Sequence, residues 1–130
     1  MARYTRQFTD FSLLFNSHPS TKDIVKKTDE EAVKASIRNL ISTKNYERPF
    51  HPEIGCQVFS LLFENFSPIT YQVIKKTIID VITKFEPRAT IIDVVLREKM
   101  DSNEIDIDVI FKLVNSEKPV TLKTAISRVR

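Results

Sequence analysis

The chain has 130 residues, of which 42% are hydrophobic and 28% are charged, and its formal net charge is +3. This size and composition predict one soluble globular domain, because no apolar run approaches the ~18 residues that a membrane-spanning helix needs. The single glycine excludes the standard phosphate-binding loop, the dinucleotide fingerprint and the serine nucleophile elbow, each of which needs at least two glycines.

The first 22 residues predict an extended amino-terminal arm. Their apolar residues, among them Phe8, Phe11 and Phe15, follow no helix or strand period, and a polar break follows them. The segment also lacks the continuous apolar core of a secretion signal. We expect the arm to lay its aromatic side chains onto the body or onto a partner.

The body of the domain is expected over residues 23–118 and begins with a short strand and a helix. The sequence TDEE, which starts at Thr28, fits a capping box in which the Thr28 hydroxyl and the Glu31 carboxylate bond free backbone amides. Apolar residues then recur at helical spacing, which predicts a helix that ends near residue 42.

A segment rich in proline follows this helix. Pro49 and Pro52 restrict the backbone at and before their own positions, and Gly55 allows a left-handed turn. We therefore expect a stiff, extended connector without regular hydrogen bonding. A short helix is expected over residues 57–66, with Phe63 on its apolar side.

The next helix has clear signals at both ends. Ser67 is a suitable N-cap, Pro68 suits the first helical position, and Pro87 ends the helix. Between them, apolar residues fall on one face and lysines lie largely opposite.

Strands occupy the rest of the chain. Residues 89–99 and 104–114 flank a turn-like cluster and predict a hairpin, and residues 119–130 predict a last strand after a proline break. The sequence therefore predicts an α+β fold, in which a small antiparallel or mixed sheet packs against three helices, with an amino-terminal arm and a carboxy-terminal edge strand.

Few residue groups suggest chemistry. Cys56 is the only cysteine, so no disulfide can form within the chain and synthesis in a reducing cytoplasm is expected. His51 and Cys56 fall short of the four ligands of a structural zinc site, and no local signature supports a Cys–His nucleophile. Paired carboxylates for glycoside hydrolysis remain an alternative to surface acids, and the candidates are Glu47, Glu53, Glu64 and Glu86.

Basic residues leave two alternatives open. The helix lysines could contact phosphates, but a solvated face fits them better because no aromatic residues are interleaved with them; they are Lys75, Lys76 and Lys84. Arg88 could pair bidentately with a carboxylate of its own chain or of a partner. The basic terminal strand could likewise be protected, or it could offer a free sheet edge to another chain.

Five ordered segments of the sequence resemble a known family. They are FTDFSLLF, HPSTKDI, EEAVKASIRNLIST, ERPFHPEIGCQVFSLLFE and FEPRATIIDV. The most specific positions are Glu47, Arg48, Pro49, Pro52, Gly55, residues 62–64, Glu86, Pro87 and Arg88. The chain resembles the small baseplate wedge subunit of contractile-tailed bacteriophages, the sheath-initiator family, which includes a baseplate subunit of type VI secretion machines. One departure is Cys56, where a small residue such as serine is common.

The resemblance implies a structural protein of the virion tail baseplate that is assembled in the host cytoplasm and is not an enzyme. It implies docking on larger wedge subunits through Glu86, Pro87, Arg88, Glu47 and Arg48. It also implies that sheath subunits add strands to the carboxy-terminal strand and so initiate the sheath, with Val120, Leu122, Lys123, Ile126 and Arg128 as the contacts. The tail tube is a further candidate partner. No cofactor, metal, nucleic acid, membrane or small-molecule substrate is implied. Some members have been described as lysozyme-like, so a small peptidoglycan hydrolase is the alternative function.

Overall fold

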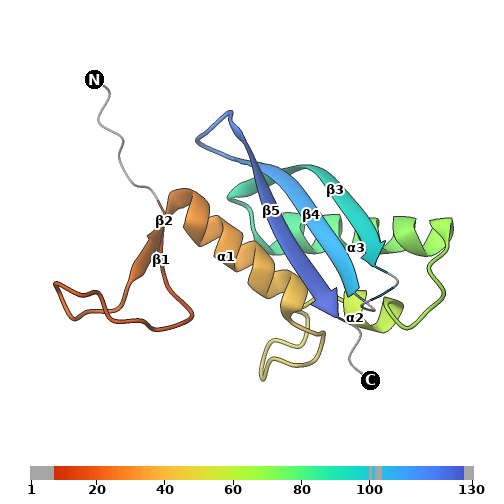
Figure 1. Cartoon of the computed structure of the whole chain (residues 1–130), viewed down its shortest axis with the longest axis horizontal. Helices are drawn as coiled ribbons and strands as arrows, with labels where there is room; N and C mark the ends of the chain where they lie inside the picture. Colours follow the sequence, from red (N-terminus) through yellow and green to blue (C-terminus); the bar gives the residue numbers. More distant parts are fainter. Residues whose placement is uncertain (1–7, 100, 102–103, 128–130) are drawn as a thin grey trace.

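A computed structural model describes residues 8–99, 101 and 104–127 of the protein (Figure 1). Two short strands come first, β1 at Thr9–Phe11 and β2 at Lys26–Thr28. Three helices follow, α1 at Asp29–Ser42, α2 at Val58–Leu61 and α3 at Pro68–Phe85. The last three strands are β3 at Ala89–Lys99, β4 at Glu104–Leu113 and β5 at Pro119–Ser127. This order confirms the predicted α+β class.

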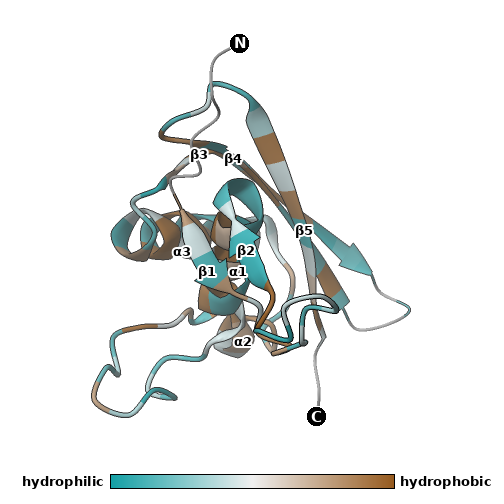
Figure 2. Ribbon diagram, turned by 90° about the vertical axis from the view of Figure 1, so that its left-hand side faces the viewer, coloured by the Kyte–Doolittle hydropathy of each residue, from teal (hydrophilic) through white to brown (hydrophobic). Residues whose placement is uncertain are grey.

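The three long strands form an antiparallel sheet in the order β3-β4-β5, and α1 and α3 lie on the same side of it (Figure 2). α3 packs against β3, and α1 packs against β5. Fully buried residues from both helices and the sheet, such as Ile37, Ile78 and Phe111, form one core. Because successive side chains of a strand point to opposite faces, the other face of the sheet carries the polar residues.

Helix α3 begins and ends where the sequence predicts. The Ser67 hydroxyl accepts a hydrogen bond from the Thr70 backbone N–H at 3.2 Å, and Pro68 occupies the first helical position. The buried face is a row of isoleucines spaced by four residues, Ile74, Ile78 and Ile82. A long, well-capped helix under β3 follows from these residues.

Helix α1 starts without the predicted capping box. Thr28 stands at the N-cap position and is also the last residue of β2, where it pairs with Thr9, but its side chain makes no capping bond. Asp29, whose φ is +46°, makes the turn into the helix. Its N–H donates to the Phe8 carbonyl at 2.8 Å, and its Oδ1 accepts from the Phe8 N–H at 3.2 Å. The expected role of Thr28 is wrong, and Asp29 ties the helix start to the amino-terminal segment instead.

β1 and β2 form a two-stranded ribbon that projects from the body beside α1 (Figure 1). The ribbon extends to Thr28, beyond the arm predicted over residues 1–22. Phe8 packs on the body, whereas four large side chains are more than half exposed: Phe11, Leu13, Leu14 and Phe15. The ribbon therefore places one aromatic residue on the body and leaves others in solvent. Residues 1–7 of the predicted arm lie outside the described residues.

The proline-rich segment is a closed loop and not the predicted extended connector. The Cys56 N–H donates to the Thr43 carbonyl at 2.8 Å, and the Tyr46 N–H donates to the Pro52 carbonyl at 3.1 Å. The chain reverses at residues with positive φ, which are Tyr46, Phe50 and Gly55. The expectation of a segment without hydrogen bonds is wrong because these reversals bring its two ends together.

Replacing Gly55 with alanine is expected to destabilise this loop. A Cβ at Gly55 would lie 2.7 Å from the backbone carbonyl carbon and oxygen of Lys44, and the φ of +153° is one that other residues rarely adopt. We expect the free energy of unfolding to fall by about 2 kcal/mol, the typical cost of one strained backbone site. Urea denaturation of Gly55→Ala measures it, with Phe50→Ala as a control at a 97% exposed side chain. Equal stability of the two variants contradicts the prediction.

Helix α2 is shorter than the predicted helix over residues 57–66. Val58 and Leu62 are buried as expected, but Phe63 is 63% exposed and lies outside the core. None of the helices in the described part of the chain is both long enough and apolar enough to cross a membrane.

Candidate functional site

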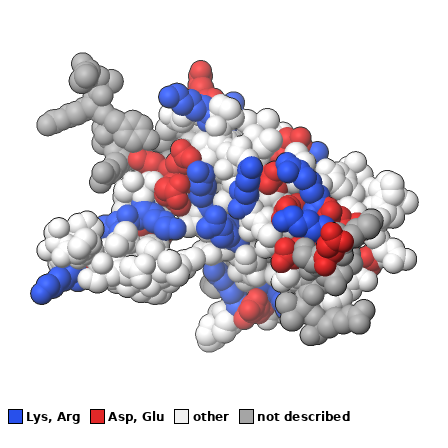
Figure 3. Space-filling view, viewed as in Figure 1, with Lys and Arg blue, Asp and Glu red and all other residues white. Residues whose placement is uncertain are grey.

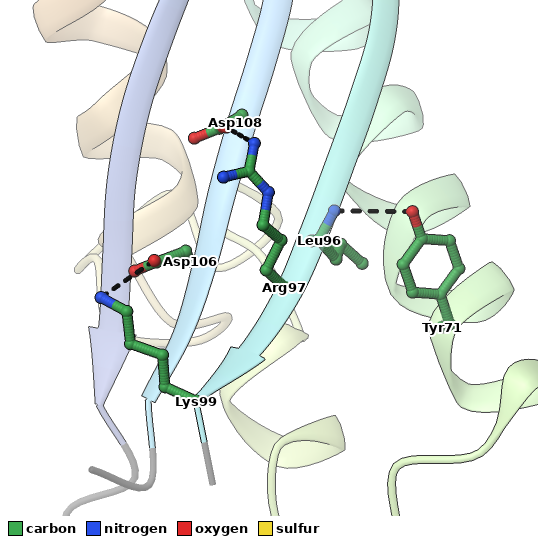
Figure 4. A network of polar contacts seen from close by, with 6 residues as sticks. All are labelled: Tyr71, Leu96, Arg97, Lys99, Asp106 and Asp108. Atoms are coloured by element: carbon green, nitrogen blue, oxygen red, sulfur yellow. Dashed lines mark hydrogen bonds and ion pairs between the residues drawn. The ribbon is translucent and has the colours of Figure 1, made fainter. Parts of the chain in front are cut away.

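The two edge strands of the sheet, β3 and β5, differ in what their outward backbone groups bond. The direction of two backbone amides in β3 shows which groups point outward. In β3, the Val94 N–H donates to Asp93 Oδ1 at 2.8 Å. The Leu96 N–H donates to the Tyr71 hydroxyl at 3.5 Å, as Figure 4 shows. Both amides therefore point away from β4. Their partners in β4, Val109 and Ile107, form non-hydrogen-bonded pairs with β3.

The alternation of hydrogen-bonded and non-hydrogen-bonded pairs along β4 determines the hydrogen bonding of β5. Because a residue that does not bond one neighbouring strand bonds the other, Val109 and Ile107 direct their amides and carbonyls to their partners Leu122 and Thr124. The alternate residues of β5 then direct their backbone groups outward, and these are Thr121, Lys123, Ala125 and Ser127. Pro119 has the same parity, so its missing N–H removes no bond from the ladder.

Among the described residues, α3 covers the β3 edge, whereas no strand pairs with the outer edge of β5. Helix α3 reaches the β3 edge with the Tyr71 hydroxyl and with Lys75, whose Nζ lies 2.6 Å from Asp93 Oδ1 (Figure 4 shows Tyr71). Within the described residues, β5 pairs with β4 and with no second strand. An unpaired strand edge can accept a strand from another chain.

The side chains predicted to contact a sheath subunit divide into two groups. Val120, Leu122 and Ile126 are at most 8% exposed and belong to the core, so their side chains face the helices. Lys123 is exposed on the other face. Arg128 lies outside the described residues. What the outer edge of β5 exposes is therefore mainly backbone, and the sheath contact itself stays a prediction.

The open face of the sheet carries interleaved charges (Figure 3). Arg97 Nη2 lies 2.6 Å from Asp108 Oδ2, and Lys99 Nζ lies 2.9 Å from Asp106 Oδ2 (Figure 4). Both pairs join β3 to β4 diagonally. Asp106 and Asp108 of β4 are thus paired within the chain, and this face resembles a solvated surface.

Glu86 and Arg88 form an internal ion pair. Arg88 Nε and Nη2 donate to Glu86 Oε1 and Oε2 at 2.6 and 2.7 Å, which is bidentate geometry. The Glu86 side chain is 2% exposed and the Arg88 side chain 28%. The Phe8 ring centroid lies 5.5 Å from the guanidinium carbon and covers part of it.

This environment determines the protonation of Glu86. Burial alone raises the pKa of a carboxyl group, but hydrogen bonds from Arg88 and Ser36 and the Arg88 charge outweigh it, so the pKa of Glu86 lies below its usual value. Of the two pairings that the sequence allowed for Arg88, the structure contains the one within the chain.

The predicted wedge-binding residues do not form one patch. Glu86 and Arg88 lie beside the middle of α1, where the Ser36 side chain hydrogen-bonds Glu86. Glu47 and Arg48 lie in the loop beyond the carboxy-terminal end of α1, and the Glu47 carboxylate accepts the Lys44 N–H at 2.9 Å. The same loop exposes Tyr46 by 81% and Phe50 by 97%, which the sequence reasoning did not single out. The prolines and the glycine of this segment were the sequence signal that could have predicted a closed loop with exposed side chains.

The candidate catalytic groups are poorly suited to proton transfer. Burial raises the pKa of the Cys56 thiol, whereas His51 is exposed and pairs with Glu53 at 3.2 Å. A hydrogen bond from its own backbone amide and the contact with His51 lower the pKa of Glu53. A glycosidase acid needs a raised pKa, which neither Glu53 nor Glu86 has. Among the described residues, no three potential ligands gather to hold a metal.

Comparison with known proteins places this fold. Residues 27–118 match the sequence profile of the family described as baseplate wedge protein gp25. The chain belongs to this gp25 family. One relative is baseplate wedge protein gp25 of Enterobacteria phage T4, which is 27% identical over 95 residues, or 73% of this chain and 72% of the relative. The family resemblance predicted from the sequence is confirmed.

Solved structures agree with the gp25 family fold. A Geobacter sulfurreducens protein, provisionally described as a tail lysozyme, superposes with a TM-score of 0.75 at 20% identity, over 82% of this chain and 96% of that protein. A chain of the anti-feeding prophage baseplate gives a TM-score of 0.65 at 20% identity, over 95% and 87%. A chain of the pyocin R2 baseplate after contraction gives 0.61 at 14%, over 75% and 96%. This gp25-family chain is therefore a structural component of the baseplate of a contractile phage-like tail.

Proposed function

We propose that this chain initiates the tail sheath by offering the outer edge of β5 to an extended segment of a sheath subunit. The supporting observation is the contrast between the two sheet edges. Four residues of β5 direct backbone groups outward without a partner strand among the described residues, whereas α3 covers the β3 edge. Each added strand would complete these backbone groups with main-chain hydrogen bonds, which do not depend on a particular sequence.

The wedge subunits would hold the chain on other surfaces. The amino-terminal ribbon, with exposed Phe11, Leu14 and Phe15, lies beside the Glu86–Arg88 pair through Phe8. This end of the molecule is far from the end of β5 at Ser127 (Figure 1). Exposed apolar side chains of this size are typical of protein interfaces. The loop with Glu47 and Arg48 would provide a separate wedge contact. One small chain would thus connect wedge and sheath. The baseplate that contains it would be assembled in the host cytoplasm.

An electron cryo-microscopy map of the assembled tail base tests this function. We expect a strand from the first ring of sheath subunits beside β5, with wedge subunits on the amino-terminal ribbon. A map in which β5 is solvent-exposed, or is covered by a wedge subunit, rejects sheath initiation through this edge.

The alternative function is a small peptidoglycan hydrolase. The observation in its favour is the provisional description of the similar Geobacter protein as a tail lysozyme. The pKa of Glu53 and that of Glu86 lie below the usual value, which makes both poor general acids and leaves Glu47 and Glu64 as the carboxylates to test. Turbidity of purified cell walls measures it directly: we expect no clearing. Clearing that is lost in Glu47→Gln or Glu64→Gln would establish the enzyme instead.

A further inference from the structure

A groove lies beside the carboxy-terminal end of β5, and the proposed sheath contact does not account for it. It has a volume of about 280 Å³ and is bounded by the end of β5, the end of α1 and helix α2. Its lining includes Ser42, Lys44, Phe59, Phe63, Ile126 and Ser127. This volume is at the lower limit of ~300–1,000 Å³ for small-molecule pockets and has room for an inserted side chain.

The lining is unusual for a surface that faces only water. Phe63, a large aromatic residue two positions after the end of α2, is 63% exposed. The Lys44 ammonium lies 5.0 Å from the centroid of the Phe59 ring, which leaves its charge at the groove without an ion pair among the described residues. Aromatic side chains that remain exposed in a concave site are common anchors for a partner.

The geometry of β5 says how a partner would reach this groove. A strand that bonds the outward groups of Ala125 and Ser127 lies about 4.8 Å beyond β5. Directly opposed residues of adjacent strands place their side chains on the same face of the sheet. Ile126 faces the helices and lines the groove, so the residue opposite Ile126 in an added strand points into the groove.

We propose that this groove is a specificity pocket for the strand that pairs with β5, and that it takes a large apolar side chain from the position opposite Ile126. The inference rests on the proposed strand addition and deepens it. Backbone pairing alone accepts any extended segment, whereas a pocket for alternate side chains selects among segments. The occupant is thus an extended sheath segment that carries leucine, isoleucine, methionine or phenylalanine at that position.

Photo-crosslinking in assembled tails tests the position of the occupant. Benzoylphenylalanine replaces Phe63 in one variant and Lys123, which is exposed on the opposite face of β5, in another. We expect both to crosslink to the same extended sheath segment, with position 63 attached at or next to a large apolar residue. Crosslinking from position 123 alone rejects the pocket and retains strand addition. Crosslinking from neither position rejects both, and attachment of position 63 to a wedge subunit or to the chain itself also rejects the pocket.

Affinity provides the second measurement. We expect Phe63→Ser to weaken binding of the purified sheath subunit about tenfold, the effect of removing one interface anchor. The matched control is Ile69→Ser, at a 77% exposed residue that does not line the groove, and it should change affinity by less than about twofold. Thermal unfolding of both variants checks that the fold is retained. Equal affinities of the two variants overturn the pocket.

Discussion

Ala125→Pro is expected to abolish sheath initiation while the domain stays folded. Ala125 is exposed and directs its N–H outward from β5, so proline at this position removes no bond to β4. The ring does remove one donor from the free edge, and it blocks the close approach of a second strand. We therefore expect sheath assembly on baseplates to fall at least tenfold, with the free energy of unfolding changed by less than about 1 kcal/mol.

Thr124→Pro is the matched control, one residue away. Thr124 directs its N–H to Ile107 in β4, so this variant loses a ladder bond and leaves a carbonyl unpaired. We expect it to be destabilised by about 1–3 kcal/mol. The two prolines thus separate loss of the edge from loss of the fold. Truncation after Lys118 cannot do so, because it also removes Val120, Leu122 and Ile126 from the core.

Negative-stain counts of sheathed baseplates, together with urea denaturation of the purified variants, measure both effects. If Ala125→Pro supports sheath of normal length and number, β5 is not the template. If Ala125→Pro and Thr124→Pro lose the same stability, the hydrogen-bond parity of the strand derived from Val94, Leu96 and Pro119 is wrong.

The elements that the sequence predicted well are those with signals at both ends. Ser67, Pro68 and Pro87 bound α3, and its isoleucines recur every four residues, so local chemistry alone determines it. Apolar and charged residues alternate in β4, a local pattern typical of a strand with one buried face, and Ile105, Ile107 and Val109 are buried. In these segments, local and global preferences agree.

The errors have a different origin, because they depend on contacts between distant segments. Thr28 is a residue type that often caps helices, but its hydroxyl makes no capping bond. Its pairing with Thr9 in the two-stranded ribbon is a contact that no local sequence pattern reveals. The proline-rich segment closes on itself through Thr43 and Cys56. Phe63 was assigned to the core from helical spacing, but α2 ends before it. Tertiary contacts override local preference at each of these places.

For the candidate site, the sequence predicted the strand involved but not which of its backbone groups are free. A terminal strand after Pro119 suggested a free edge, but the outward groups of that strand became clear only from the bonds of Val94 and Leu96 on the far side of the sheet. The groove could not be predicted at all, since it needs α1, α2 and β5 together. Arg88 shows the same limit: its sequence neighbours allow an internal or an external pair, and only the fold decides.

Arg88→Ala is expected to lower the free energy of unfolding by about 3 kcal/mol at neutral pH. The change leaves the Glu86 carboxylate, which is 2% exposed, without its charged partner. Breaking a buried ion pair in this way costs about 3–5 kcal/mol, and the partial exposure of Arg88 favours the lower end. Lys99→Ala is the control, because its pair with Asp106 is solvent-exposed and should contribute less than about 1 kcal/mol.

The pH dependence distinguishes this mechanism from a general loss of packing. In the native chain, the pKa of Glu86 lies below its usual value, so its contribution is complete above pH ~4.3 and is lost as the pH falls through the folded pKa. Without Arg88, burial dominates and raises the pKa of Glu86. Acidification then protonates Glu86 and removes the cost of a buried, unpaired carboxylate in the variant. The stability gap between the two proteins should therefore narrow from pH 7 to pH 4 in urea denaturation. A constant gap would mean that Arg88 acts through packing on Phe8.

The double variant Glu86→Leu, Arg88→Leu then separates stability from docking. Replacing both members of a buried pair by apolar residues is often close to neutral, so we expect most of the lost stability to return. Where Arg88→Ala also weakens wedge binding, recovery of that binding in the double variant would mean that Arg88 serves the fold and supports docking indirectly. If stability returns but wedge binding does not, the exposed 28% of Arg88 contacts the wedge directly, and the internal pair has a second role in orienting the guanidinium toward that partner.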